Sequence, residues 1–458
     1  MKPKTPARAS GGNDGASAGL HARQIAAEIL MMVEHRGGYA DALLGARLPA
    51  LELPDRRLAT RLVLGTIAWQ ARLDYELERL CKRDLAGIQP EAVTIMRMGL
   101  LQLRFLDRIP HHAAVSTSVE LAKRSRGAKA AAGFINAVMR RATRETIALP
   151  ARTADEIRWL AIMYSHPRWM VERFVEWFGR EDAERLMAAN NEAAPNVLRL
   201  NLARASRAEI VAKLEADGME IASEGRAAET VILKGAPRFD GESYRAGLFQ
   251  AQSEASQLVT RMLAPARGAT VVDCAAAPGA KSAHLAELVG SPGRVIAVDL
   301  NLAGLKSARG VCRQLHHRNV DFIRADAFAA LPMRERRFEY VLLDAPCTGL
   351  GTLREHPEIR WRLGPDDPSR IAKLQLQMLR NAAAIVQPGG AIVYSVCSLA
   401  PEEGEAVIRE FLRAQPEFEI DAHAPNCDDL LGADGVMRTR PDRGSLDGFF
   451  AARLKRKS

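Results

Sequence analysis

Strand-like and helical segments alternate from residue 248 to the C-terminus of this 458-residue sequence, and this alternation limits the possible folds most strongly. Short apolar runs are separated by longer segments whose apolar residues recur at helical spacing. Such alternation is typical of a mainly parallel sheet with helices on both faces. We therefore predict a doubly wound α/β domain over 248–458. Its expected strands contain TVVDC, RVIAVDL, VDFIRAD, YVLLDAP and GAIVYSV.

Three regions precede this domain. Residues 1–19 are mainly Gly, Ala, Ser and Lys, with little to bury, so a disordered basic tail is expected. Residues 20–146 carry apolar residues at i, i+3, i+4 and i+7 in successive segments, which predicts an all-α bundle. Residues 147–247 combine helical segments with short alternating runs such as NVLRLN and TVILKG, which predicts a small α+β module.

The charge and the cysteine content favour a cytoplasmic protein with a polyanionic partner. The 64 Lys and Arg residues outnumber the 55 Asp and Glu residues and give a net charge of +9, so nucleic acid is the first candidate. The six cysteines include no CxxC pair, so reduced thiols are expected, without a disulfide or a metal site. No run approaches 18 apolar residues, and the N-terminus lacks an apolar export signal, so no membrane association is expected.

A basic edge is expected at the end of the helical bundle. Its side chains could contact phosphates or form a solvated charged face, and the sequence leaves both readings open. The residues are Lys123, Arg124, Arg126, Lys129, Arg140, Arg141 and Arg144.

The stretch TVVDCAAAPGAKSAHLAEL predicts a strand, a turn of small residues and a helix that begins near Lys281. Small side chains allow backbone N–H groups and the helix N-terminus to approach a ligand closely. Asp299 ends the next strand, twenty residues after Gly279, where an acid can bind ribose hydroxyls. The GxGxxG pattern of dinucleotide sites is absent, which favours a nucleoside without a pyrophosphate, such as S-adenosylmethionine. Asp326, after the third strand, could accept from an adenine amine, although strand-end acids also cap helices.

Two cysteines follow the fourth and fifth predicted strands. Because ligands bind at the carboxyl ends of parallel strands, we expect Asp344, Cys347 and Cys397 to converge there. A thiolate that adds to C6 of a pyrimidine makes C5 nucleophilic toward a methyl donor, and a carboxyl group at the base edge can stabilise the developing charge. The other four cysteines are expected to be small buried apolar residues. These are Cys81, Cys274, Cys312 and Cys427.

Several stretches resemble, in order, the motifs of the NOL1/NOP2/Sun family of RNA cytosine-5 methyltransferases. The resemblance covers about residues 150–458, and the helical region before it looks like a NusB-like RNA-binding domain. This combination is similar to the members of the family that act on bacterial 16S ribosomal RNA. The matching stretches are DCAAAPGAKS, VIAVDLN, RADAF, LLDAPCTGLGTLREHPEIRW, GGAIVYSVCSLAPEEGEAV and DGFFAARLKR.

The resemblance implies a Rossmann-like class I methyltransferase domain, an RRM-like module at 147–247 and a last, antiparallel strand at DGFFAARL. It implies that Cys397 is the nucleophile, that Cys347 helps to release the product, and that Asp344 contacts both cofactor and base. S-adenosylmethionine would be held by Asp299, Asp326 and Asp344 together with the turn. The residues of that turn are Ala275, Ala276, Ala277, Pro278, Gly279, Ala280 and Lys281. The expected partner is 16S ribosomal RNA or its precursor particle, met by a monomer.

Some positions depart from the family pattern. Ala280 stands in place of a second glycine, and because alanine does not adopt a positive φ cheaply, a shifted turn is expected. The stretch REHPEIRW offers Arg354, Arg360 and Trp361 as two phosphate contacts and a stacking ring, although Trp361 could equally be a core residue. The other departures are Ala275, Ser282, Val396, Glu355 and Ser253, most of them small for small.

Other functions remain open from the sequence alone. A DNA cytosine-5 methyltransferase takes its nucleophile from a Pro-Cys motif, so Cys347 would attack and Cys397 would be incidental. A tRNA could replace ribosomal RNA as the substrate. A non-catalytic RNA-binding or ribosome assembly factor would retain the fold without the reaction.

Overall fold

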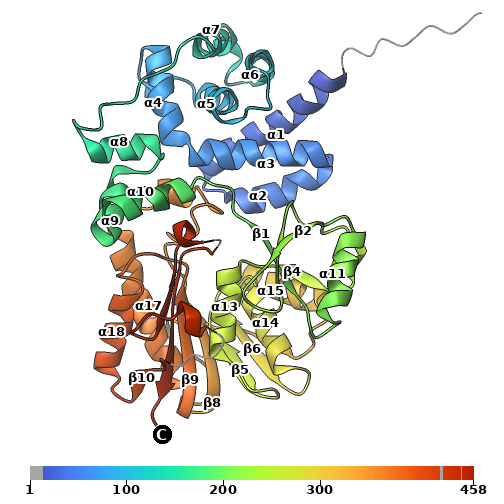
Figure 1. Cartoon of the computed structure of the whole chain (residues 1–458), viewed down its shortest axis with the longest axis vertical. Helices are drawn as coiled ribbons and strands as arrows, with labels where there is room; N and C mark the ends of the chain where they lie inside the picture. The colour runs from blue at the N-terminus through green and yellow to red at the C-terminus, as the bar shows by residue number, and fades with distance from the viewer. Residues whose placement is uncertain (1–13, 423–426, 445) are drawn as a thin grey trace, which may run out of the picture. The chain divides into compact units, whose positions relative to one another are not determined.

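A computed structural model describes residues 14–422, 427–444 and 446–458, which form two compact units (Figure 1). One unit contains the chain up to Asn191 together with Leu353–Arg362, and the other contains Glu192–Thr352 and Leu363–Ser458. No helix among the described residues is long and apolar enough to cross a membrane. Of the tail expected over 1–19, the first thirteen residues lie outside the described residues, and helix α1 already begins at Asp14.

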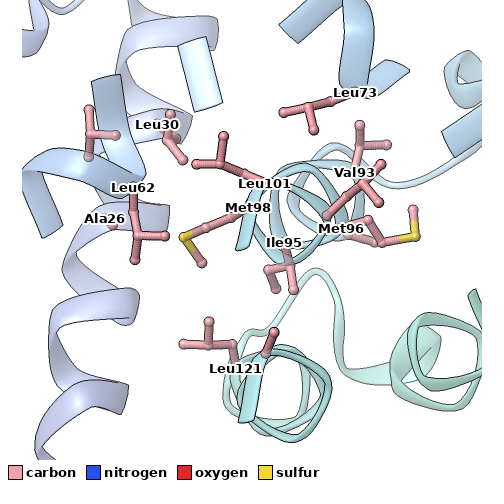
Figure 2. Packing of buried hydrophobic residues seen from close by; sticks show 14 of the residues in the cluster. Ala26, Leu30, Leu62, Leu73, Val93, Ile95, Met96, Met98, Leu101 and Leu121 are labelled. Atoms are coloured by element: carbon pink, nitrogen blue, oxygen red, sulfur yellow. The ribbon is translucent and has the colours of Figure 1, made fainter. Parts of the chain in front are cut away.

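The first unit is helical, as the periodicity of residues 20–146 predicts. Helix α5 lies at its centre, because every residue from Ala92 to Leu103 is buried. Figure 2 shows Leu30 of α1, Leu62 of α3 and Leu121 of α6 around the apolar side chains of α5. A helix that is apolar on all sides must be covered on all sides, which explains the surrounding layer. The helices are α1 (Asp14–Arg36), α2 (Ala40–Arg47), α3 (Leu53–Ala68), α4 (Gln70–Cys81), α5 (Pro90–Phe105), α6 (His111–Arg124), α7 (Ala132–Ala142), α8 (Glu156–Met163), α9 (Arg168–Phe178), α10 (Arg180–Ala189) and α16 (Ile359–Arg362).

The segment Leu353–Arg362 belongs to this helical unit, and Arg360 is its anchor. The Arg360 side chain is fully buried and donates to the carbonyls of Ala68 at 3.2 Å and Ser165 at 3.0 Å, and to Asn191 Oδ1 at 2.9 Å. Burial lowers the pKa of Arg360 to about 9. The interpretation of Arg360 as a phosphate contact is therefore wrong, because its guanidinium group is fully buried and both of its terminal nitrogens already donate inside the unit. The indole of Trp361 donates to the carbonyl of Ile67 at 2.7 Å and packs against the helical core.

The second unit contains a small antiparallel sheet in the order β2-β3-β1-β4. Helix α11 packs on it through Ile210 and Leu214, and starts at a capping box between Ser206 and Glu209. The boundary between the two compact units falls inside the predicted module at 147–247, since α8, α9 and α10 group with the helical unit. The elements are β1 (Asn196–Leu200), α11 (Arg207–Ala216), β2 (Ile221–Glu224), β3 (Thr230–Leu233), α12 (Glu242–Arg245) and β4 (Phe249–Ala251).

The large sheet of the second unit has the order β10-β12-β9-β8-β5-β6-β7, with β11 paired to β12. Strands β5 to β9 are parallel, and β12 runs antiparallel to β9, so the predicted doubly wound fold and its last strand are confirmed. The elements are α13 (Glu254–Leu263), β5 (Thr270–Asp273), α14 (Ala280–Val289), β6 (Arg294–Asp299), α15 (Leu302–Gln314), β7 (Val320–Arg324), β8 (Phe338–Asp344), α17 (Asp367–Ala384), β9 (Val386–Val396), α18 (Glu405–Ala414), β10 (Phe418–Ile420), β11 (Val436–Thr439) and β12 (Phe449–Arg456).

Both faces of this sheet are covered, which explains why its central strands are continuously apolar. Val341 and Leu343 of β8 belong to one hydrophobic cluster with α17 and α18, whereas Leu342 belongs to another with α13 and α14. Successive side chains of a strand point to opposite faces, so each face receives every second residue. Figure 1 shows α17 and α18 on one side of the sheet and α13, α14 and α15 on the other. The chain order reverses between β5 and β8, which places the ligand-binding crevice at the carboxyl ends of these strands.

Candidate active site

The two cysteines that follow β8 and β9 lie side by side. Strand β8 pairs with β9 so that Asp344 is opposite Ser395, and the sulfur of Cys347 lies 3.2 Å from that of Cys397. Both thiols are partly buried. The structure thus brings Asp344, Cys347 and Cys397 to one place, as the strand ends predict. Among the other cysteines, Cys274, Cys312 and Cys427 are buried as expected, whereas Cys81 is only half-buried.

Asp344 connects the thiols to the turn before α14. Its Oδ1 accepts from Ser395 Oγ at 2.7 Å, and its Oδ2 accepts from Lys281 Nζ at 2.7 Å. Burial alone would lower the pKa of Lys281, but the Asp344 carboxylate outweighs it and holds that pKa above its ordinary value. Lys281 is therefore a cation at neutral pH, and its ammonium group lies 5.6 Å from the ring centre of Phe449. Ser395 was missed from the sequence, because only the strand register identifies it as a partner of Asp344.

Cys347 keeps its proton more firmly than an ordinary cysteine. Its hydrogen bond with Cys397 raises the pKa of the Cys347 thiol, and burial raises it further. The charges of Glu403 and Asp344 act in the same direction. Cys347 is therefore mainly a neutral thiol at neutral pH.

The turn over residues 275–281 has a single left-handed residue, Gly279, with φ of +109°. A Cβ on Gly279 would lie 2.4 Å from Cα of Ala308, so only glycine fits there. Ala280 is the first residue of α14 and does not have a positive φ. The expectation of a turn shifted by Ala280 is therefore wrong. Helix α14 begins without a side-chain cap, which leaves its first N–H groups to a ligand.

The two predicted strand-end acids have different surroundings. Asp299 accepts from the N–H of Ala277 at 2.9 Å and from the N–H of Asn301 at 2.8 Å, so it holds the turn directly. Asp326 accepts from the N–H of Phe328 at 2.9 Å and thus also closes its own turn. Both carboxylates are half-buried and retain lone pairs for a ligand.

Asp273, the last residue of β5, was not singled out from the sequence. Its carboxylate is buried and accepts from Ser282 Oγ of α14 at 2.6 Å. Burial raises the pKa of Asp273 to about 6, against the opposing effect of the Ser282 hydrogen bond. The signal that could have identified it is a strand-end acid directly before a turn of small residues. Asp273 thus fixes the start of α14 to the end of β5.

We expect Asp273→Asn to change how stability depends on pH. A folded-state pKa raised to about 6 means that the native state binds more protons than the unfolded chain between about pH 4 and 6. The parent therefore loses about 2–3 kcal/mol of stability as pH rises through this window, and the variant does not. Urea unfolding of both proteins at pH 4.5 and pH 7.5 measures the difference. The same change in the free energy of unfolding between the two pH values in both proteins would contradict the raised pKa of Asp273.

The sheet order, the uncapped start of α14 with its small-residue turn, and the acids at successive strand ends are features of a class I, Rossmann-like methyltransferase. The model of a family described as 16S rRNA methyltransferase RsmB/F matches residues 260–455. The NusB family matches residues 20–144, and an RsmF/B-like ferredoxin-like domain matches residues 166–240.

Named relatives match almost the whole chain. Ribosomal RNA small subunit methyltransferase B of Thermus thermophilus is 37% identical over 95% of this chain and 97% of its own length. The probable ribosomal RNA small subunit methyltransferase B of Bacillus subtilis is 33% identical over 95% of this chain and 98% of its own length. The crystal structure of PH0851 superimposes with a TM-score of 0.82 at 28% identity, covering 96% of this chain and 98% of that one.

The chain therefore belongs to the RsmB/F family of 16S rRNA methyltransferases. It is a methyltransferase enzyme with a NusB-family helical domain and a ferredoxin-like module before the catalytic domain, which confirms the predicted fold class and the predicted enzyme class.

Proposed function

We propose that this protein methylates C5 of a cytosine in 16S ribosomal RNA, with S-adenosylmethionine as the methyl donor and Cys397 as the nucleophile. The observation that carries the proposal is the pair of sulfurs 3.2 Å apart beside the Asp344–Lys281 ion pair. The names of the relatives support the RNA substrate. The substrate is free RNA or a precursor particle, and the enzyme acts as a cytoplasmic monomer without a metal ion.

The residues around the turn fit S-adenosylmethionine. The uncapped N-terminus of α14 can bind a carboxylate, and Asp299 and Asp326 offer lone pairs to ribose hydroxyls and to an adenine amine. Gly279 allows close approach of the backbone, and Lys281 and Asp344 lie next along the path to the thiols. When bound, S-adenosylmethionine supplies an electrophilic methyl group.

The reaction begins when the thiolate of Cys397 adds to C6 of the cytosine. The addition places electron density on C5, which becomes nucleophilic. Asp344 binds the base edge near N3 and orients the ring for this addition. The Lys281 ammonium group and the Ser395 hydroxyl hold the Asp344 carboxylate in place for this contact.

Cys347 acts after the new bond at C5 has formed. The C5 proton must then leave and the bond between Cys397 and C6 must break, which needs a group beside Cys397 that handles protons. Cys347 lies 3.2 Å away and has a raised pKa, which favours this role over that of nucleophile. The opposite assignment, in which Cys347 attacks as in DNA cytosine-5 methyltransferases, requires Cys347 to ionise although its pKa is raised.

Trapping on RNA that contains 5-fluorocytosine separates the two assignments. Fluorine at C5 cannot leave as a proton does, so the covalent adduct accumulates. We expect Cys347→Ala to form the adduct and Cys397→Ala to form none, with turnover of Cys397→Ala reduced more than about 10³-fold. Denaturing gel electrophoresis of labelled RNA measures the adduct.

Cys81→Ala is the matched control for this experiment, because Cys81 is a half-buried thiol at the end of α4 in the helical unit. It is expected to trap RNA like the parent protein. Adduct formation by Cys397→Ala but not by Cys347→Ala would establish the DNA-type order of attack instead.

Part of the basic edge of the helical unit is free of internal salt bridges and can contact RNA. Arg124 pairs with Glu120 at 3.0 Å and Arg141 pairs with Glu145 at 2.6 Å, so these two are charge-balanced. The other five side chains are exposed and form no salt bridge within the described part of the chain, although the charge of Arg144 acts on nearby Glu145. They are Lys123, Arg126, Lys129, Arg140 and Arg144. Unpaired charges gain most from phosphates, because no internal ion pair has to be broken first.

We expect replacement of Lys123, Arg126 and Lys129 together by Gln to weaken RNA binding. Each lost phosphate contact lowers the slope of log K against log salt by about 0.7 for single strands to 0.9 for duplex, so the slope falls by about 2–3. Fluorescence anisotropy across a salt series measures it. Gln replacements at Arg173, Arg180 and Arg185, which are paired with acids, remove the same net charge and are expected to leave the slope nearly unchanged. Equal effects of the two sets would contradict a contact at the basic edge.

Bisulfite mapping tests the function as a whole. We expect 16S ribosomal RNA from cells that lack the protein to lose a 5-methylcytidine that returns with the gene. A loss in tRNA instead would change the substrate. Calorimetry with S-adenosylmethionine addresses the remaining alternative, since a folded protein that binds none would be a non-catalytic RNA-binding or assembly factor.

A further inference from the structure

A buried carboxylate lies behind the two thiols. Glu403 is fully buried between the end of β9 and the start of α18. Its Oε1 accepts from the N–H of Thr348 at 2.9 Å and from Gln375 Nε2 at 2.9 Å. Its Oε2 accepts from the hydroxyl of Thr348 and from Ser398 Oγ, the latter at 2.5 Å. One side chain therefore receives four hydrogen bonds.

Three of the four hydrogen bonds come from direct neighbours of the two cysteines. Thr348 follows Cys347 in the chain and Ser398 follows Cys397, so the Glu403 carboxylate bridges the two loops that carry the thiols. The two hydroxyls are also within 3.0 Å of one another. The same carboxylate thus fixes both loops at positions one residue from each sulfur.

Further hydrogen bonds from Tyr394 and Gln375 fix the backbone around the Glu403 bridge. The Tyr394 hydroxyl donates to the Glu403 carbonyl at 2.6 Å, and Gln375 Nε2 also donates to the carbonyl of Pro346 at 2.9 Å. Burial raises the pKa of Glu403, while the Ser398 and Thr348 hydrogen bonds oppose it. Hydrogen bonds to a charged group in a dry environment are strong and directional, so this arrangement defines distances closely.

We propose that Glu403 is the positioning residue that sets the separation of the Cys347 and Cys397 sulfurs. Its hydrogen bonds go to Thr348, Ser398 and Gln375, so it acts through the loops rather than on the reacting atoms. The importance of this separation for catalysis rests on the proposed function, in which one thiol attacks and the other assists release. A backbone hydrogen bond of 3.0 Å from Gly351 to Cys397 links the same loops, so loss of Glu403 loosens the pair without separating it completely.

The proximity of the sulfurs can be measured without reference to their roles. Diamide oxidises two adjacent thiols to a disulfide and is itself reduced to the hydrazine, and peptide mass spectrometry follows the formation of the Cys347–Cys397 bond. We expect Glu403→Ala to slow this bond formation and to lower kcat, each at least tenfold, with the dissociation constant for S-adenosylmethionine within twofold of the parent.

Two further variants separate positioning from a general loss of folding. Glu403→Gln retains the shape, and the hydroxyls of Thr348 and Ser398 can turn to accept from its amide, so both rates are expected to stay within threefold of the parent. Ser398→Ala removes only the link to the Cys397 loop and is expected to give an intermediate loss of both rates, even if Glu403→Ala does not fold. Glu405→Ala is the matched control. Glu405 is two residues from Glu403 in the chain, and its replacement removes only a partly exposed ion pair with Arg438.

The outcomes distinguish this inference from the proposed function. Unchanged disulfide formation in Glu403→Ala and Ser398→Ala would overturn the positioning role, whatever the catalytic cysteine proves to be. Loss of both rates in Glu403→Gln would also overturn it, because charge rather than the bridge would then be essential. Slower disulfide formation without slower turnover would leave the geometric role intact and count against the proposed use of both thiols.

Discussion

The parallel pairing of β8 with β9 is the constraint on which the site depends. This register places Asp344 opposite Ser395, and each strand then continues into a loop that carries one thiol. A shift by one residue would turn Asp344 and Ser395 toward opposite faces of the sheet and separate the sulfurs. The register is fixed by burial on both faces, since Leu342 and Leu343 belong to hydrophobic clusters on opposite sides. The apolar core of the sheet therefore determines the geometry of the polar site.

The sequence was most informative where a local pattern has one structural meaning. Strands that alternate with helices predict a parallel sheet, and acids or thiols at strand ends must then share one edge, which the contact between Cys347 and Cys397 bears out. The sequence predicted a turn of small residues before α14, but not which residue of the turn has a positive φ. One glycine, Gly279, takes the only positive φ in the turn, so Ala280 is free to begin the helix.

The sequence was least informative where a side chain finds partners far away in the chain. Arg360 lies beside an aromatic residue in a polar stretch, which is a sequence context typical of a phosphate contact. Its hydrogen-bond acceptors are instead protein groups of residues 68, 165 and 190–191, which are far away in the chain. Helices α8 to α10 group with the helical unit, which the sequence did not predict. The periodicity of a helix shows that it has an apolar face, but it does not show which hydrophobic core covers that face. Glu403 was not identified from the sequence for the same reason. The stretch CSLAPEE does not distinguish a buried glutamate with four hydrogen-bond donors from a glutamate exposed to solvent.

The groups around Cys347 bear on which of the two thiols attacks the base and which assists release of the product. Two thiolates 3.2 Å apart would repel each other strongly, which disfavours ionisation of both sulfurs at once. The hydrogen bond to Cys397, burial and the charges of Glu403 and Asp344 all keep the proton on Cys347. The nearby cation, Lys281, is in turn held by Asp344. Because the charges of both carboxylates oppose a thiolate at Cys347, they support the proposal that Cys397 is the sulfur that attacks.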